Sequence, residues 1–223
     1  ATLNFTQDGA GRNQITNVYQ LQGMAADLAG DYVLANNIDA SLISANGNTS
    51  NVWGGRGFAP VGDNSGNHFT GSLDGQGFVI DGLTINRDSQ DFVGLFGALG
   101  TSSSVTNLGL ERVSLSGADQ TGALTGVAFG SVDKVYSSGS VTGGDYTGGL
   151  IGVQASGNTN ASYSSATVTG EDFVGGLVGL FQGTLLSNSY ATGSVTGAVE
   201  VGGLVGHVYL GRVENTFATG SVV

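Results

Sequence analysis

Apolar and polar positions alternate along most of this chain, and a period of two is typical of β-strands rather than helices. In "GSVTG", one valine stands between two hydroxyl residues and glycines close both ends. Short runs of this kind, rich in β-branched residues and separated by glycine-containing turns, recur through the second half of the sequence. The pattern therefore predicts many short strands.

The strands belong to an internal repeat. An apolar-glycine box ends at Gly97, Gly126, Gly152, Gly179 and Gly206, at separations of 29, 26, 27 and 27 residues. A second box carries Tyr136, Tyr163, Tyr190 and Phe217, which are spaced 27 residues apart. Repeats that cannot bury an apolar face alone are stabilised by stacking on their neighbours. We therefore expect an all-β fold, a right-handed parallel β-helix (β-solenoid) with about 27 residues per coil.

In such a solenoid, equivalent side chains form ladders about 4.8 Å apart. One predicted ladder holds Leu124, Leu150, Leu177 and Leu204, and another, led by Leu115, holds Val141, Val168, Val195 and Val222. The aromatic positions, led by Leu110, make a third. Burial of each such side chain contributes about 1.5–3 kcal/mol.

The first part of the chain is less regular. Leu21, Met24 and Leu28 have helical spacing, Asn17 is a candidate N-cap and Gly30 a stop, so we expect a short N-terminal capping helix over residues 17–29. A polar, Gly/Asn-rich insertion follows at residues 41–57. The expected organisation is one continuous domain, with a cap and irregular first coils over residues 1–90 and regular coils over 91–223.

These residues carry a family resemblance. The stretch "GGLVGLFQGTLLSNSYATGSVTG" resembles the GLUG motif of large bacterial surface proteins and some immunoglobulin-A-cleaving peptidases. The upstream block "YVLANNIDASLI" to "VGLFG" is similar to the segment that precedes such repeats in exoproteins of the filamentous-haemagglutinin type. The resemblance implies a non-catalytic segment of an exported adhesin or surface fibre, extracellular or at the bacterial cell surface. The protease part of the peptidases is a separate zinc domain, and no "HExxH" occurs in this sequence.

The amino-acid composition limits the classes of partner that this chain could bind. The net charge is −11 with only six Lys and Arg, which excludes a nucleic-acid footprint. No apolar run reaches the about 18 residues of a membrane span, so no membrane insertion is expected. Cysteine is absent, which excludes disulfides and thiolate metal sites. The expected partners are a glycan or protein on a host or neighbouring cell, bound through the parent protein, and further solenoid coils stacked end to end.

Few residues of the sequence are candidates for a catalytic role. His68 and His207 fall in different coils, and no convergent partners are evident. Asp74 in "LDGQG" and Asp81 in "VIDGL" are the closest carboxylate pair on predicted strands. Turn-forming Asp-Gly sequences explain them, while a polysaccharide-active β-helix enzyme, which needs two carboxylates about 5–9 Å apart, remains an alternative. We expect no enzymatic activity and no cofactor other than Ca²⁺.

Three sets of residues are candidates for binding. Trp53 and Arg56 in the insertion either stack on a sugar ring or plug the side of the first coil. Hydroxyl residues flank the valine ladder and resemble the Thr-x-Thr arrays of ice-binding β-solenoids; they are also expected in a plain soluble surface. These hydroxyl positions are Ser140, Thr142, Thr167, Thr169, Ser194 and Thr196.

The third set is acidic. An aspartate precedes four of the apolar-glycine boxes: Asp91, Asp119, Asp145 and Asp172. Stacked about 4.8 Å apart, such carboxylates repel each other, and a Ca²⁺ ion would relieve the repulsion. The alternative is a solvated corner, where water screens each pair to about 1 kcal/mol.

Overall fold

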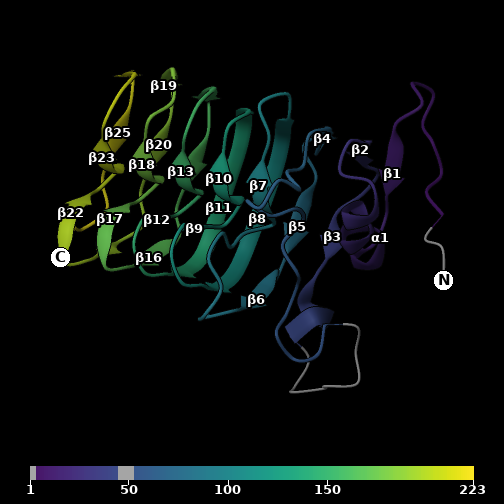
Figure 1. The fold of residues 1–223 in the computed structure, drawn as a ribbon, viewed down its shortest axis with the longest axis horizontal. Helices are drawn as coiled ribbons and strands as arrows, with labels where there is room; N and C mark the ends of the chain where they lie inside the picture. Colours follow the sequence, from purple (N-terminus) through teal and green to yellow (C-terminus); the bar gives the residue numbers. More distant parts are fainter. Residues whose placement is uncertain (1–3, 45–52) are drawn as a thin grey trace.

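The computed structural model describes residues 4–44 and 53–223. Its coils lie side by side along the long axis of the molecule, with the N-terminus at one end and the C-terminus in the last coil (Figure 1). Every pairing between named strands is parallel, as in Val141 with Val168 and Val168 with Val195. The predicted β-solenoid with 27 residues between equivalent positions is confirmed.

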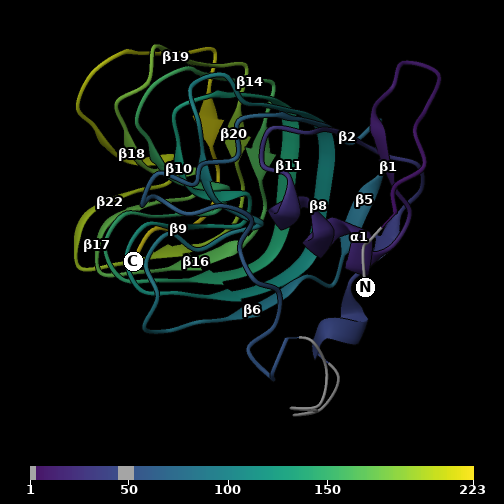
Figure 2. The same ribbon diagram turned by 45° about the vertical axis from the view of Figure 1, so that its right-hand side comes forward.

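The strands form three parallel sheets, and Figure 2 shows the chain winding from one to the next. The largest sheet runs from the N-terminal coils to the last coil, and the two smaller sheets accompany it only in the later coils. In the described part of the chain, the largest has sixteen strands. They are β1 (Asn13–Ile15), β2 (Asp31–Leu34), β3 (Ile38–Asp39), β4 (Ser72–Asp74), β5 (Val79–Asp81), β6 (Thr84–Asn86), β8 (Ser104–Ser116), β11 (Ser131–Thr142), β14 (Asn158–Asn160), β15 (Tyr163–Ser164), β16 (Thr167–Thr169), β19 (Leu185–Ser187), β20 (Tyr190–Ala191), β21 (Val195–Thr196), β24 (Arg212–Glu214) and β25 (Phe217–Ala218).

The two smaller sheets complete each coil. One contains β7 (Phe96–Leu99), β10 (Thr125–Ala128), β13 (Ile151–Gln154), β18 (Val178–Phe181) and β23 (Val205–Val208). The other contains β9 (Thr121–Gly122), β12 (Thr147–Gly148), β17 (Asp172–Gly175) and β22 (Val199–Gly202). The apolar-glycine box lies where these two sheets meet, because the glycines there allow the backbones of successive coils to approach closely. A β-carbon on Gly176, for example, would stand 2.1 Å from the carbonyl oxygen of Gly203 in the next coil.

The predicted leucine ladder forms the core. Leu124, Leu150 and Leu177 are fully buried, while Leu204 in the last coil is partly buried and packs against them. The valine ladder behaves in the same way, with Val141, Val168 and Val195 buried and Val222 exposed. Both ladders therefore face inward. Leu204 and Val222 are less buried than the other members because they lie in the last coil, which has a neighbouring coil of this chain on one side only.

The aromatic ladder requires a correction. Tyr136, Tyr163, Tyr190 and Phe217 stack in register, with ring centroids 4.7–4.9 Å apart and interplanar angles of 2–3°, as predicted. However, the rings lie on the outside of the solenoid, because the following residues, Ser137, Ser164 and Ala191, are the fully buried ones. Period-two alternation places the aromatic residue and its neighbour on opposite faces.

The prediction that Leu110 leads this ladder is also wrong. Tyr136 is in register with Gly109, whereas Leu110 faces Ser137 and is buried. The cause is a register shift between β8 and β11, at Ser137 and Gly139. Equivalent residues are 27 apart before the shift and 26 apart after it. An alignment based on the downstream boxes therefore misplaces the upstream residues by one.

The N-terminal end is closed by helical turns. Helix α1 (Val18–Gly23) continues into the 3₁₀ turn η1 (Met24–Ala26), so the helical segment ends earlier than predicted (Figure 1). Asn17 is its N-cap, as predicted, and its side chain accepts hydrogen bonds from the backbone N–H groups of Tyr19 and Gln20. Leu21 and Met24 are fully buried. The apolar face of the helical segment thus covers the first coil.

Other N-terminal elements differ from the sequence expectation. Strand β1 precedes the helix and pairs with β2, and a second 3₁₀ turn, η2 (Ser41–Ser44), follows β3. The stretch "DYVLANNIDA" is divided into β2 and β3 by a polar bend. Polar residues at that bend allow the chain to turn a corner of the coil, which a single continuous strand would miss.

Candidate binding surfaces

The hydroxyl residues form two columns on one face. Ser140, Val141 and Thr142 are in register with Thr167, Val168 and Thr169, and the next rung continues with Val195 and Thr196. The valines are fully buried, and their neighbours point outward; all six hydroxyl residues are exposed except Ser194, which is half-buried. The structure therefore brings together the six residues that the sequence singled out, and a ligand for them stays a prediction.

This face is longer than the sequence suggested. Ser114 and Ser116 are in register with Ser140 and Thr142, and the rung before them holds Thr84 and Asn86. These residues line a shallow recess of about 260 Å³ together with Ile85 and Leu115. The polar-apolar-polar pattern of "TIN" and "SLS" was the available signal, but irregular spacing in the early coils hid it.

The aspartate column is held by hydrogen bonds between coils. The backbone N–H of Asp119 donates to Oδ1 of Asp91 at 3.2 Å. The same contact repeats from Asp145 to Asp119 at 3.0 Å and from Asp172 to Asp145 at 3.1 Å. Each of the first three carboxylates thus faces a peptide dipole of the next coil, which offsets part of the repulsion along the column.

The column differs from a typical calcium site. Within residues 4–44 and 53–223, no group of three or more His, Cys, Asp or Glu side chains is arranged to hold a metal ion. A Ca²⁺ ion takes six to eight oxygen ligands, of which carboxylates usually supply several. Calcium binding by Asp91, Asp119, Asp145 and Asp172 stays an untested alternative to the solvated corner, and any site would need further oxygens from the backbone or water.

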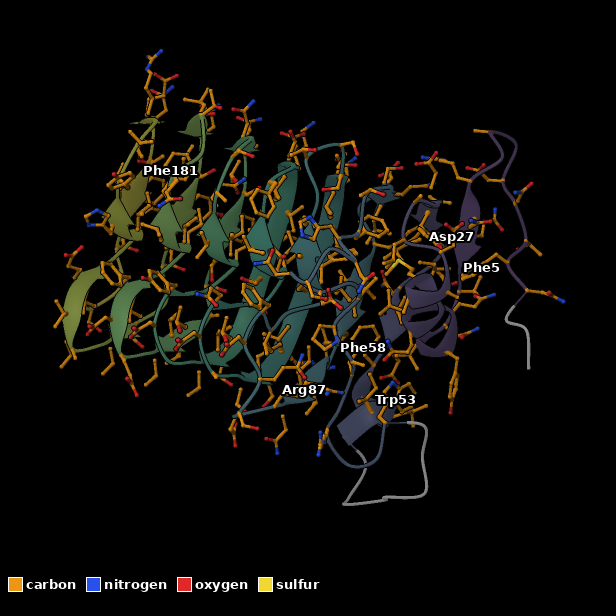
Figure 3. The ribbon with its side chains drawn as sticks, in the orientation of Figure 1. Phe5, Asp27, Trp53, Phe58, Arg87 and Phe181 are labelled. Carbon is orange, nitrogen blue, oxygen red and sulfur yellow. The ribbon has the colours of Figure 1, made fainter. Side chains whose placement is uncertain are left out.

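Trp53 is buried, with 6% of its surface exposed. Its ring stacks on Tyr19 at a centroid distance of 5.2 Å, and its Nε1–H donates to Oε1 of Gln22 at 2.9 Å. Figure 3 shows it beside the N-terminal helical segment, on the same side as Phe58 and Arg87. This geometry favours the plug over the sugar-stacking platform, because a buried indole offers no free face. Residues 45–52 of the predicted insertion lie outside the described residues.

Arg56 lies at the surface beside a second arginine, Arg87. The two line a recess of about 390 Å³ that also contains Asn86 and Gln90. Burial, together with the positive charge of Arg56, lowers the pKa of Arg87. Arg87 donates to the carbonyl oxygen of Phe58 at 3.2 Å and to Oε1 of Gln90 at 3.1 Å. Arg56 therefore stays a candidate for ligand binding, with a different neighbour from the one predicted.

The two candidate catalytic carboxylates are each ion-paired. Asp74 accepts hydrogen bonds from Arg12 at 2.9 Å, from the backbone of Gln76 at 2.9 Å and from Asn107 at 3.2 Å. Burial raises the pKa of Asp74, but the hydrogen bonds outweigh it and hold the pKa below its usual value. Asp81 pairs with Arg112 through both carboxylate oxygens. A general acid needs a raised pKa, so Asp74 is poorly suited to that role.

The histidines have separate surroundings. His68 stacks on Phe129 at a centroid distance of 5.4 Å, and His207 pairs with Glu200 in the last coil. Neither is hydrogen-bonded to a hydroxyl nucleophile in the described structure. As for membranes, the helices of the described ranges are all too short or too polar to cross a bilayer.

Comparison with known proteins agrees with the repeat. The GLUG motif family matches residues 197–223, which form the last coil. The chain contains a GLUG-repeat region. It is 36% identical over 145 residues to halomucin of Haloquadratum walsbyi, and 36% identical over 140 residues to a protein of Evansella cellulosilytica described as a Gly-rich membrane protein. These alignments span 65% and 48% of this chain but only 2% and 16% of the relatives.

A solved structure has the same fold as this chain. It is a Bacteroides ovatus protein described as an immunoglobulin A1 protease, with a TM-score of 0.79 and 22% identity. The superposition covers 97% of this chain and 68% of the other. At this identity the likeness shows the fold alone.

Proposed function

We propose that this chain is a non-catalytic segment of an exported bacterial adhesin or surface fibre, and that it serves as a stiff stalk with a binding surface. The observation that carries the proposal is the continuous series of parallel strand pairings from β8 through β11, β14 and β19 to β24. Each coil adds about 4.8 Å of length. Hydrogen bonds between coils run along the axis, a direction that suits resistance to shear, and few charges project from the Ser/Thr-rich face.

The relatives support a place at the cell surface. One bears the name halomucin and the other is described as a Gly-rich membrane protein. An extracellular or surface-exposed solenoid agrees with both names and with the filamentous-haemagglutinin-like parentage that the sequence suggests. The proposed partners are a glycan or protein on a host or neighbouring cell, reached through the parent protein, and further coils that extend the solenoid.

Attachment assays test this role. Beads coated with the chain should attach to epithelial or bacterial cells more than beads coated with albumin. A variant that lacks residues 45–52, and so keeps the buried Trp53, should attach less while keeping its strand-rich circular dichroism. Attachment no greater than that of albumin for every cell type would contradict the adhesin role. A variant with an intact insertion and Asp88→Asn on the nearby surface is the control.

A second candidate function is ice or carbohydrate binding by the hydroxyl face. The regular columns that contain Ser140, Thr142, Thr167 and Thr169 favour it, because a flat array with one repeat distance fits an ordered lattice of water or sugar hydroxyls. Thermal hysteresis at millimolar protein, lost in Thr167→Val/Thr169→Val and retained in Thr192→Val outside the columns, would support it. Absence of hysteresis in the wild type would remove ice binding.

The enzyme alternative has its own test. A polysaccharide-active β-helix would require Asp74 or Asp81 to act on substrate. We expect no turnover of pectin, alginate or peptide substrates. Turnover that disappears in Asp74→Asn or Asp81→Asn, with the fold intact, would overturn the non-catalytic proposal.

A further inference from the structure

The outer aromatic column stops abruptly at one end. Tyr136, Tyr163, Tyr190 and Phe217 stack on one another, but the residue in register with Tyr136 in the preceding coil is Gly109. The Tyr136 ring reaches over this glycine, and a β-carbon on Gly109 would stand 2.6 Å from Cζ and the hydroxyl oxygen of the ring. The column therefore cannot continue, and a step is left in the surface.

A recess of about 450 Å³ occupies this step. The volume is within the range of about 300–1,000 Å³ that is typical of small-molecule sites. Tyr136 and Lys134 form one side, Gly109 and Leu108 lie between the walls, and the turn that follows β4 forms the other side with Asp74, Gln76 and Gly77; Asn107 completes the lining. The later coils, all of them described, lack this combination, because an aromatic residue replaces the equivalent glycine in each of them.

Three polar side chains of the recess are held in place before any ligand arrives. Asp74 is held by Arg12 at 2.9 Å and by Asn107 at 3.2 Å. Arg12 is in turn anchored by Asp8 at 2.8 Å. The Tyr136 hydroxyl donates to Oε1 of Glu111 at 2.7 Å, which orients the ring. Preorganised groups of this kind lose little conformational entropy on binding.

The balance of charge and hydrogen-bonding groups indicates the ligand. The lining of the recess contains one carboxylate, Asp74, which pairs with Arg12, and one ammonium group, Lys134, which pairs with Asp133. An anion would meet the carboxylate of Asp74, and a cation would meet the ammonium group of Lys134. Asn107 and Gln76 each offer both a donor and an acceptor, Lys134 offers donors, and Asp74 offers acceptors. A sugar hydroxyl is itself both donor and acceptor, and the apolar face of a pyranose ring packs well on an aromatic side chain.

We propose that the recess formed by Asp74, Gln76, Asn107, Lys134 and Tyr136 binds a neutral pyranose unit of a glycan. It is a different surface from the hydroxyl columns and from Arg56, and none of the described residues of the insertion lines it. The site is independent of the stalk role, because a sugar would bind the isolated chain whether or not beads coated with it attach to cells.

Titrations followed by amide chemical shifts in nuclear magnetic resonance test the proposal. The probes are methyl β-galactopyranoside, methyl β-glucopyranoside and methyl α-mannopyranoside, with sodium glucuronate as the anionic control and sorbitol as the open-chain control. At least one neutral pyranoside should shift the amides of Gln76, Asn107 and Gly109. Absence of shifts there for all three pyranosides, or equal affinity for glucuronate or sorbitol, would overturn the proposal.

Two matched pairs of variants locate the site. Asn107 and Asn188 both occupy left-handed corners, with φ of 53° and 51°, so glycine is tolerated at each. Both side chains donate to a polar group nearer the N-terminus, at 3.2 and 2.8 Å. Asn107→Gly should weaken sugar binding at least about tenfold, the loss of one hydrogen bond to a charged group, and Asn188→Gly should leave it unchanged.

The second pair examines the aromatic ring. Tyr136→Leu should also weaken binding at least about tenfold, the equivalent of about 1.4 kcal/mol, whereas Tyr190→Leu changes the same column away from the recess and should have no effect. Equal affinity of the wild type and Asn107→Gly would contradict the site even if Tyr136→Leu proved too unstable to study. Loss of binding in the two control variants as well would also contradict it.

Discussion

The N-terminal region and the regular coils reach the same architecture with different kinds of packing. Residues 4–44 and 53–90 use large, dissimilar side chains, among them Tyr32, Phe58 and Phe69, all fully buried, and ion pairs such as Arg12 with Asp8 and Asp74. The regular coils use ladders of equivalent Leu and Val residues and hydrogen bonds that repeat from coil to coil. A repeated coil needs only a copy of itself as a neighbour, whereas an end coil needs a surface shaped to cover it.

The first prediction concerns the shaped N-terminal core. Phe69 is fully buried, and its ring lies 4.7 Å from that of Phe96 and 6.2 Å from that of Tyr32. Phe69→Ala should lower the free energy of unfolding by about 3–5 kcal/mol, as measured by urea denaturation. Phe129→Ala, which removes a half-buried ring on the outside, is the control and should cost less. Equal losses of unfolding free energy in the two variants would mean that the buried Phe69 ring stabilises the fold no more than a half-buried ring on the outside.

The second prediction concerns the ladder. Leu177→Ala should lower the free energy of unfolding by about 2–5 kcal/mol, because Leu177 is fully buried and the cavity would be enclosed by coils on both sides. Leu204→Ala truncates the same ladder in the last coil, where the side chain is only partly buried, and should cost clearly less. If both variants lost the same stability, stacking would not be the source of the ladder's contribution.

Acid should weaken the N-terminal region through hydrogen-bonded carboxylates. Hydrogen bonds from the Ser65 hydroxyl, the Asn67 side chain and the Ser65 backbone lower the pKa of Asp63 to about 2. Its unfolded value is about 3.9, so its stabilising contribution is present above about pH 4 and is lost as the pH falls toward 2.

The acid effect can be isolated by mutation. The urea midpoint, followed by Trp53 fluorescence, should fall between about pH 4 and 2 in the wild type. The fall should be smaller in Asp63→Asn, and Asp88→Asn removes the same charge from an exposed side chain as the control. A fall of the same size in Asp63→Asn and the wild type would contradict this role for Asp63.

The smallest expected effect lies in the aspartate column. Asn retains the oxygen that accepts the backbone N–H of the next coil, so Asp145→Asn should preserve the contact and relieve repulsion worth at most about 1 kcal/mol. Asp145→Ala removes the acceptor and should be less stable than Asp145→Asn. We expect Tm to be the same in calcium and in chelator. A rise of Tm with calcium that is absent in Asp145→Asn would instead establish the predicted calcium site.

The repeat made the architecture predictable, and irregularities limited the detail. The 27-residue spacing of Tyr136, Tyr163 and Tyr190 predicted their stacking correctly. The same spacing carried one coil back from Tyr136 falls on Gly109, but alignment on residues beyond the register shift near Gly139, where equivalent residues are 26 apart, pointed to Leu110 instead. The recess therefore could not be foreseen: it depends on Asp74, Asn107 and Tyr136 coming together from separate coils.

The N-terminal region was harder to predict for a physical reason. Asn17 and the spacing of Leu21 and Met24 identified the helical segment, because capping and periodicity are local signals. Strand β1 and the burial of Trp53 depend on contacts with distant residues, which no local pattern records. That residues 1–90 and 91–223 form one continuous domain stays a prediction.

Removal of one whole coil tests most directly that stacked, interchangeable coils carry this structure. Leu150 and Leu177 are equivalent ladder positions, so deletion of residues 150–176 joins Gly149 to Leu177 in register. Small-angle X-ray scattering should show a folded protein whose long dimension is shorter by about 4.8 Å. Deletion of residues 150–163, about half a coil, should abolish folding because the ladders no longer meet. An unfolded or aggregated whole-coil variant, or a half-coil variant as stable as it, would contradict the account.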